Sequence, residues 1–269
     1  MAVVMAAIGM GIYFKGHEFI DSMRSWQKIE AAGETDAGTK GMAESDPSPG
    51  NGELSAAMLI ELGNLSESES ARLVFNALAG AWNVSPVPEK AGLDHFQGMS
   101  LAASERKLHL QKFSGNLGGL LRIDYPAGIE LSLPGVAGKR FLALVGVEEE
   151  ELFIEPAIAG RHSLSFKELE KHWFGQAFFL WKDPLMLLPR IAWGSRGAQV
   201  KQLQELLKEA GVFGGAPTGI YDGETVAAVK KFQFSKGIEQ DGVVGGQTLM
   251  LLYRSIDRFG LPRLQAGRK

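Results

Sequence analysis

The sequence predicts an α+β fold in which helices and an antiparallel sheet are followed by a small bundle of helices. Three observations lead to this prediction. Apolar residues recur every three or four positions in residues 56–82 and again in residues 200–256, which is typical of amphipathic helices. Between these regions apolar and polar residues alternate in short runs, as they do in strands with one buried face. The continuous apolar run 141–147 is typical of a central strand buried on both faces.

The composition narrows the classes of function. The chain of 269 residues has a formal net charge of −3, so nothing favours nucleic acid as a partner. It contains no cysteine, which excludes disulfides, thiolate metal sites and a cysteine nucleophile. Its histidines form neither H-x-x-x-H nor H-E-x-x-H spacing, and we therefore expect no metal and no other cofactor.

Residues 1–30 begin with an apolar stretch that carries no charge before Lys15. Spanning a bilayer takes about 20 apolar residues, and this stretch is shorter. We favour a truncated membrane anchor with a juxtamembrane helix; the alternatives are an uncleaved signal-like segment and a buried or interfacial helix. Residues 31–52 lack aromatic residues, and we expect a disordered linker because little apolar surface offsets the entropy of ordering.

Residues 53–184 form the predicted α+β domain, which is helical over residues 56–62 and 68–82. From residue 117 onward we expect strands, because apolar residues alternate with others. The alternating positions are Leu121, Ile123, Tyr125, Ile129, Leu131 and Leu133. The acidic run 148–151 is expected to be a solvated turn.

One helix is expected among the strands. Ser165 and Glu168 have the spacing of a capping box, which predicts a helix over residues 165–174. A strand over residues 176–181 is expected to follow it.

Residues 185–258 are predicted to form the helical bundle, and residues 259–269 a tail. The motif G-x-x-x-G-x-T occurs twice in the bundle, and each copy predicts a tight turn followed by a helix, because glycine reaches positive φ without a Cβ clash. The expected structural turn residues are Gly219, Gly223, Gly242 and Gly246.

Three longer motifs occur in order in this region, ending in D-G-x-x-G-x-x-T. Their positions are Gly194, Gly197, Val200, Leu203, Gln204, Leu207, Gly219, Tyr221, Thr225, Ala228, Val229, Phe232, Gln233, Asp241, Gly242, Gly245 and Thr248. In this order they resemble the peptidoglycan-binding domain type 1 family. Gly246 departs from that family, which often has proline there. The resemblance implies a non-catalytic three-helix module that docks on the glycan strands or stem peptides of the cell wall.

The polar residues beside the glycine turns are the candidate peptidoglycan-binding residues: Tyr221, Asp222, Gln233 and Asp241. Stem peptides carry amines, amides and carboxylates, which a shallow groove recognises with backbone donors and a few polar side chains. The alternative is that Asp222 and Asp241 only organise their turns.

Tryptophans offer a second possible contact with sugars. Trp173, Trp181 and Trp193 have side chains large enough to stack on a sugar ring, but we favour core packing for all three.

Residues 53–184 end in S-x-x-E-L-x-x-x-W-x-G-x-x-x-x-L-W, after an apolar strand, a short turn and a strand with an acid–proline pair. This order resembles the C39 papain-like peptidase fold. The resemblance implies a cysteine on an early helix, a histidine at the start of the central strand and an aspartate before the proline. Here cysteine is absent, Arg140 or Phe141 stands at the histidine position, and Glu155 precedes Pro156. We therefore expect a degenerate domain with no catalytic residues.

The order of anchor, linker, degenerate C39-like domain and wall-binding module resembles the periplasmic part of the general secretion pathway protein A family. That resemblance implies a single-pass inner-membrane protein with most of its chain in the periplasm. It also implies peptidoglycan, the inner membrane and secretion-system proteins as partners, among them the secretin and general secretion pathway protein B. The family's ATPase is not in this sequence, which lacks G-x-x-x-x-G-K-[ST].

The function expected from the sequence is therefore a membrane-tethered periplasmic scaffold that binds peptidoglycan and assists a type II secretion channel through the wall. A cell-wall hydrolase targeted by the same module is the first alternative. A structural envelope protein unconnected with secretion is the second.

Overall fold

The computed structural model describes residues 54–89, 93, 95–188 and 191–264, all of which belong to one compact unit. The predicted membrane anchor and the predicted linker lie outside the described residues. Within the described part of the chain, no helix is long and apolar enough to cross a membrane.

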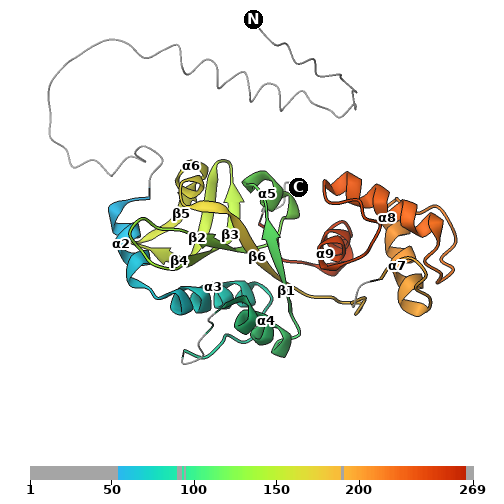
Figure 1. Ribbon diagram of the computed structural model, residues 1–269, viewed down its shortest axis with the longest axis horizontal. Helices are drawn as coiled ribbons and strands as arrows, with labels where there is room; N and C mark the ends of the chain where they lie inside the picture. Colours follow the sequence, from blue (N-terminus) through green and yellow to red (C-terminus); the bar gives the residue numbers. More distant parts are fainter. Residues whose placement is uncertain (1–53, 90–92, 94, 189–190, 265–269) are drawn as a thin grey trace, which may run out of the picture. The chain divides into compact units, whose positions relative to one another are not determined.

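Six strands form one antiparallel sheet in the order β1-β6-β2-β3-β4-β5 (Figure 1). The strands are β1 (His109–Ser114), β2 (Ala127–Leu131), β3 (Arg140–Glu148), β4 (Glu151–Ile158), β5 (Arg161–Ser165) and β6 (Trp173–Trp181). β3 lies between β2 and β4, and residues 140–144 in its first half are all buried, as expected for a central strand. The α+β prediction with an antiparallel sheet is confirmed.

Helices pack on the sheet from one side, where Figure 1 shows α3 and α4 together. The helices of this group are α2 (Ala56–Asn64), α3 (Glu67–Ala81) and α4 (His95–Glu105). α3 begins where the Ser66 hydroxyl accepts a hydrogen bond from the Glu69 amide at 3.0 Å. Its buried side chains, among them Val74 and Phe75, pack against β2, β3 and β4, which makes α3 the main cover of this face.

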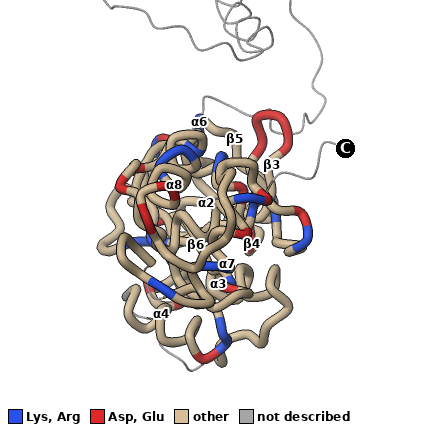
Figure 2. The backbone as a smooth tube through the Cα atoms, turned by 90° about the vertical axis from the view of Figure 1, so that its right-hand side faces the viewer, with Lys and Arg blue, Asp and Glu red and all other residues tan. Residues whose placement is uncertain are grey.

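The acidic turn between β3 and β4 is exposed, as predicted. Figure 2 shows it as a red segment beside β3. Four successive glutamates repel one another least when water surrounds them, so this turn stays at the surface.

The strand predicted from residue 117 is wrong, because the segment is helix α5 (Leu117–Ile123). The Asn116 side chain caps it by accepting a hydrogen bond from the Gly119 amide at 2.8 Å. Leu117, Leu120 and Ile123 are buried at a spacing of three, so helical burial decides the structure here.

β1, β5 and α4 were not predicted from the sequence. β1 is an edge strand that pairs only with β6, and most of its side chains are half-exposed or exposed, so alternation is weak there. The capping box of helix α6 (Phe166–Glu170) is confirmed, with Ser165 and Glu168 bonded to each other's backbone amides. The helix is shorter than predicted because Trp173 already belongs to β6, where its indole N–H donates to the Gln176 carbonyl at 2.7 Å.

The C-terminal helices are those that the sequence predicts: α7 (Ala198–Glu209), α8 (Gly223–Lys236) and α9 (Gly246–Arg254). A single 3₁₀ turn, η1 (Asp257–Phe259), comes after them. Gly211 ends α7 with a φ of +74°, the left-handed conformation expected for a glycine just beyond a helix.

Candidate functional site

The two glycine turns of the bundle are built around buried glutamine side chains. In the first turn the Gly219 amide donates to Gln204 Oε1 at 2.8 Å. The amide nitrogen of the same glutamine donates to the Ile220 carbonyl at 3.0 Å and to Thr225 Oγ1 at 2.9 Å. One side chain therefore ties α7 to the turn and to the start of α8.

The second turn repeats this arrangement. The Gly242 amide donates to Gln233 Oε1 at 2.9 Å. Gln233 Nε2 donates to the Val243 carbonyl at 3.0 Å and approaches Thr248 Oγ1 at 3.3 Å. Gly219 and Gly242 have φ values of +75° and +71°, as their turns require.

The role of the glutamines was missed by sequence reasoning. Gln204 follows Leu203, and Gln233 follows Phe232, on the buried stripes of their helices. A polar residue repeated at the same place on two apolar stripes is the signal that would have found this role, because a buried amide requires partners.

Two of the four candidate peptidoglycan-binding residues are buried. Tyr221 is only 1% exposed, and its hydroxyl donates to the Gly242 carbonyl at 2.9 Å, so it links the two turns. Burial, with Asp241 nearby, raises the pKa of Tyr221 and keeps it protonated. Gln233 is 2% exposed. Direct contact of these residues with peptidoglycan stays a prediction.

The other two candidates hold turns while remaining partly exposed. The Asp222 carboxylate accepts a hydrogen bond from the Thr225 amide at 3.0 Å, and this bond lowers the pKa of Asp222. Asp241 accepts hydrogen bonds from the Val243 amide at 2.9 Å and from Gln233 at 2.8 Å. These are the contacts of the turn-organising alternative, and ligand contact at either aspartate stays a prediction.

The tryptophans divide into two groups. Trp173 and Trp181 are buried, as predicted, whereas the prediction of core packing is wrong for Trp193, which is 70% exposed. Trp193 occupies a tight turn closed by a hydrogen bond from the Ser195 amide to the Ala192 carbonyl at 3.0 Å, with Gly194 at a φ of +85°. The backbone therefore holds this indole at the surface, beside Gly223 at the start of α8.

The start of β3, where the C39 resemblance implies a histidine, holds a buried arginine. Arg140 is 7% exposed and donates to the carbonyls of Leu62 and Gly63, at 3.1 and 3.3 Å, which end α2. An arginine side chain donates hydrogen bonds and accepts none, so it offers no general base at this position. Among the described residues, no group of acidic or histidine side chains is arranged to hold a metal ion.

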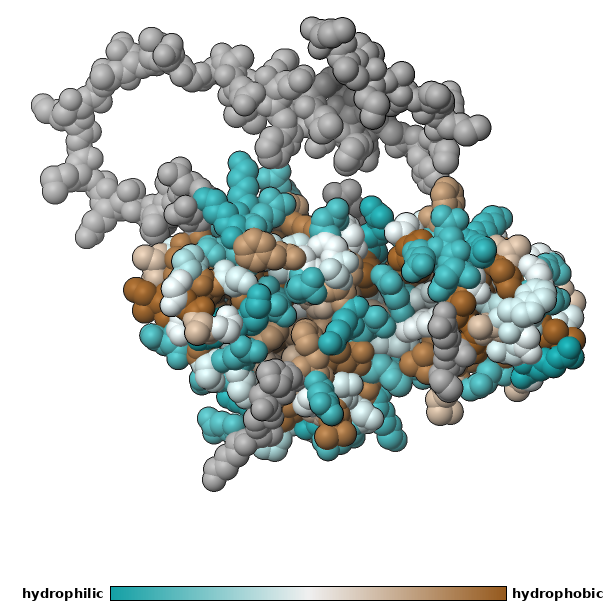
Figure 3. Space-filling view, in the orientation of Figure 1, coloured by the Kyte–Doolittle hydropathy of each residue, from teal (hydrophilic) through white to brown (hydrophobic). Residues whose placement is uncertain are grey.

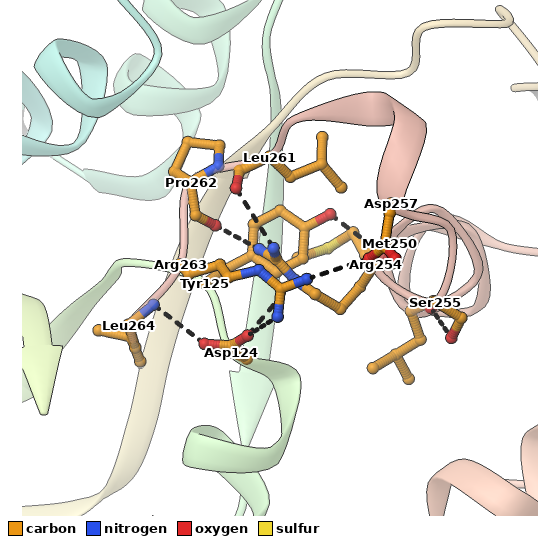
Figure 4. Close-up of polar contacts among 11 residues, drawn as sticks. Asp124, Tyr125, Met250, Arg254, Ser255, Asp257, Leu261, Pro262, Arg263 and Leu264 are labelled. Carbon is orange, nitrogen blue, oxygen red and sulfur yellow. Dashed lines mark hydrogen bonds and ion pairs between the residues drawn. The ribbon is translucent and has the colours of Figure 1, made fainter. Parts of the chain in front are cut away.

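An aromatic and ionic cluster joins the bundle to the sheet (Figure 4). The Tyr125 hydroxyl, just after α5, donates to the Met250 carbonyl of α9 at 3.1 Å. The Arg254 guanidinium lies 4.1 Å from the centre of the Tyr125 ring, and Arg254 Nε lies 3.8 Å from an Asp124 carboxylate oxygen. Burial lowers the pKa of Arg254, and its partners Tyr125 and Asp124 oppose that loss.

Residues 259–264 return to the sheet after α9; we call them the C-terminal strap. Asp124 accepts a hydrogen bond from the Leu264 amide at 3.1 Å and forms an ion pair with Arg263 at 3.3 Å. The buried Leu264 also accepts a hydrogen bond from the Val147 amide of β3 at 2.9 Å. The bundle is thus attached to the sheet through both the connection before α7 and the strap after α9.

Comparison with known proteins agrees with this architecture. Residues 196–252 match the family model described as putative peptidoglycan binding domain. None of the curated proteins compared with this chain matches it.

Several solved structures are similar to this chain. A periplasmic domain of the EpsAB fusion protein of the Vibrio vulnificus type II secretion system has 18% identity and a TM-score of 0.44, over 74% of this chain and 82% of that one. The peptidase C39 like domain of a toxin secretion ATP-binding protein from Vibrio parahaemolyticus has 14% identity and a TM-score of 0.34, over 44% of this chain and 99% of that one. The SleB N-terminal domain has 31% identity and a TM-score of 0.25, over 25% of this chain and 92% of that one. The family match confirms the resemblance of the bundle to the peptidoglycan-binding family that was stated from the sequence.

Proposed function

We propose that this protein is a periplasmic scaffold, tethered to the inner membrane, that binds peptidoglycan through α7–α9. The observation that carries the proposal is the match of residues 196–252 to the peptidoglycan-binding family. The two turns that Gln204 and Gln233 hold support it, because they give this module a fixed surface.

The surface around the first turn is where we propose contact with the glycan strand. Trp193 presents its indole there, close to Gly223, which has no side chain to cover it. Asp222 lies beside the same turn and offers acceptors for sugar hydroxyls. An aromatic face with polar neighbours suits a sugar ring, whose C–H groups stack while its hydroxyls bond at the edge. Figure 3 shows apolar side chains scattered among hydrophilic ones over the face in view.

Co-sedimentation of the full chain with purified wall sacculi tests the proposal. Full-chain variants are preferable to fragments, because separating the bundle from the sheet would expose Tyr125 and Tyr253, which are both buried. We expect Trp193→Ala to weaken binding roughly fivefold, about 1 kcal/mol for a lost stacking contact. The matched control is Phe174→Ala, which removes an equally exposed aromatic ring from β6. Failure of the unaltered chain to sediment with sacculi would refute wall binding.

The sheet domain is proposed to be a non-catalytic spacer or partner surface. The absence of cysteine from the chain and the use of Arg140 to cap α2 support this proposal. Incubation with wall fragments should give no new products by mass spectrometry. Reproducible cleavage that a sheet-domain substitution abolishes would instead favour the wall-hydrolase alternative.

A role in type II secretion is the finer part of the proposal, and it rests on the order of segments in the sequence. The partners it implies are the secretin and general secretion pathway protein B, with the bundle holding the channel at the wall. Crosslinking in intact envelopes should join this chain to secretin subunits. Crosslinks to other envelope proteins alone would support the structural alternative unconnected with secretion.

A further inference from the structure

A cleft opens between the sheet domain and the bundle. It is formed by the segment from the end of β1 through α5, by the end of α8 and by α9, and its volume is about 350 Å³. The aromatic and ionic cluster at Tyr125 and the C-terminal strap link the bundle to the sheet domain, so the two sides of the cleft are joined by direct contacts. Its size lies in the range of small-ligand sites.

Two cations face this cleft from its opposite walls. Arg122 comes from α5 and Lys236 from the last turn of α8. A Cβ atom added at Gly237 would lie 2.6 Å from Arg122 Nη1, so the guanidinium lies against the backbone next to Lys236. Two cations that line one cleft favour an anionic ligand, because an anion there would offset both charges.

Among the described residues no carboxylate neutralises either cation, and Lys236 Nζ lies 5.4 Å from the centre of the Phe232 ring. In the part of the chain that the structure describes, no ion pair joins Arg122 or Lys236 to a carboxylate. Lys236 is half-buried, and burial lowers its pKa, which shows that water solvates this ammonium group incompletely. The end of α8, with its partial negative charge, offsets only part of this cost.

The remaining lining is suited to a short peptide. Ile123, Ile238 and Leu251 offer apolar surface, and Asn116 and Gln247 add polar groups. Asn116 Oδ1 already accepts a hydrogen bond from Gly119, so the cations are the main recognition groups. Glu239 also lines the cleft and disfavours ligands that carry only negative charge.

We propose that this cleft binds a carboxylate of the wall stem peptide, with Arg122 and Lys236 as its two cationic contacts. The proposal rests on the proposed wall binding and adds that the sheet domain supplies half of the site. Arginine can grip a carboxylate with two parallel hydrogen bonds, and lysine adds a point charge from the other wall. The alanine methyl groups of a stem peptide fit the apolar lining.

The test compares two synthetic stem peptides by calorimetry with the full chain, one with free carboxylates and one with the carboxylates amidated. We expect the amidated peptide to bind at least roughly tenfold more weakly, because it loses the charge-assisted hydrogen bonds. Arg122→Gln and Lys236→Gln should each weaken the free peptide roughly tenfold, and Arg122→Lys should weaken it less. The matched control is Lys231→Gln, which removes an exposed cation from α8 outside the cleft.

Several outcomes would overturn the proposal. Equal affinity for the two peptides, or an unchanged affinity in a variant that combines Arg122→Gln with Lys236→Gln, would show that the cations do not recognise a carboxylate. Displacement of the peptide by an equal concentration of inorganic phosphate would show a general anion site instead. If the chain sediments with sacculi but binds neither peptide, the cleft proposal fails while wall binding stands. If it does not sediment with sacculi, the proposed function itself fails.

Discussion

In both glycine turns a buried glutamine side chain, Gln204 or Gln233, hydrogen-bonds to the turn; we call each of these a glutamine clamp. The two turns differ in the residues that begin the next helix. In the first turn Asp222 caps α8 with its side chain, whereas Gly245 stands at the equivalent place before α9 and makes no side-chain cap. The next residue, Gly246, lies so close to the sheet that an added Cβ would be 2.5 Å from Gln111 Oε1 and 3.4 Å from the Trp181 ring. The second copy therefore lacks a side chain at both positions where the bundle meets the sheet, whereas the first copy has the Asp222 side chain and places Gly223 beside the exposed Trp193. The same local structure serves wall contact in one copy, by our proposal, and packing in the other.

The glutamine clamps should give the largest effects. Gln204→Ala and Gln233→Ala each leave a buried glycine amide and a threonine hydroxyl short of a partner, so we expect a loss of about 3 kcal/mol in the free energy of unfolding. Urea unfolding of the full chain measures it. The control Gln202→Ala, at an exposed position of α7, should stay within about 0.5 kcal/mol. A large loss in only one of the two clamps would break the equivalence of the turns.

Alanine at the turn glycines should come next. Gly219→Ala and Gly242→Ala force a residue with a Cβ into left-handed backbone, at about 1–2 kcal/mol each. Gly242→Ala should be the worse of the two, because the new Cβ would lie 2.9 Å from a methyl group of Val226. Thermal unfolding should show both as a drop of several degrees. Unchanged melting of either variant would contradict a requirement for positive φ there.

The caps distinguish the copies by pH. The Thr225 amide lowers the folded-state pKa of Asp222, so the stability from this carboxylate is present above the ordinary aspartate pKa of about 3.9 and is lost as pH falls through the folded-state value. Asp222→Asn keeps a cap but does not titrate. We therefore expect the urea midpoint of the unaltered chain to fall further than that of Asp222→Asn between pH 6 and pH 3. If the urea midpoints of the two proteins fall by the same amount, Asp222 does not contribute to the loss of stability in acid.

Restoring the missing cap should have a smaller effect. Gly245 has the extended backbone of an N-cap and open space around its Cβ position, so Gly245→Asn should stabilise α9 by a few tenths of a kcal/mol. Differential scanning calorimetry can resolve the corresponding rise in melting temperature. A fall would mean that the second turn needs glycine there for a reason other than packing.

The smallest contrast is between the first helical residues. A Cβ atom added at Gly223 would have its nearest neighbour, in Trp193, at 3.8 Å. Gly223→Ala should therefore leave the stability of the chain unchanged or raise it slightly. Gly246→Ala must displace the flexible end of Gln111, and we expect a loss below about 1 kcal/mol. If the two variants melt alike, the sheet does not select glycine at the second copy.

Much of this arrangement could be predicted from the sequence, because local patterns decide it. The bundle helices, the turns at Gly219 and Gly242 and the buried strand β3 result from periodicity and from glycine's access to positive φ. The strand prediction fails at α5, because a seven-residue segment is too short to separate the two periodicities. The exposure of Trp193 depends on the tight turn that holds it, and the approach of Arg122 to the end of α8 depends on contacts between segments distant in sequence; periodicity encodes neither.

The C-terminal strap has a mechanical consequence. A bundle joined to the sheet domain by one connection can rotate about that connection. The second attachment, where the strap contacts Asp124 and Val147, restricts this rotation. By our proposal the bundle binds the wall, and a force applied there would reach the sheet through β3 as well as along the chain before α7. The two attachments therefore keep the sheet domain in a fixed orientation relative to the bundle and to the ligand that the bundle binds.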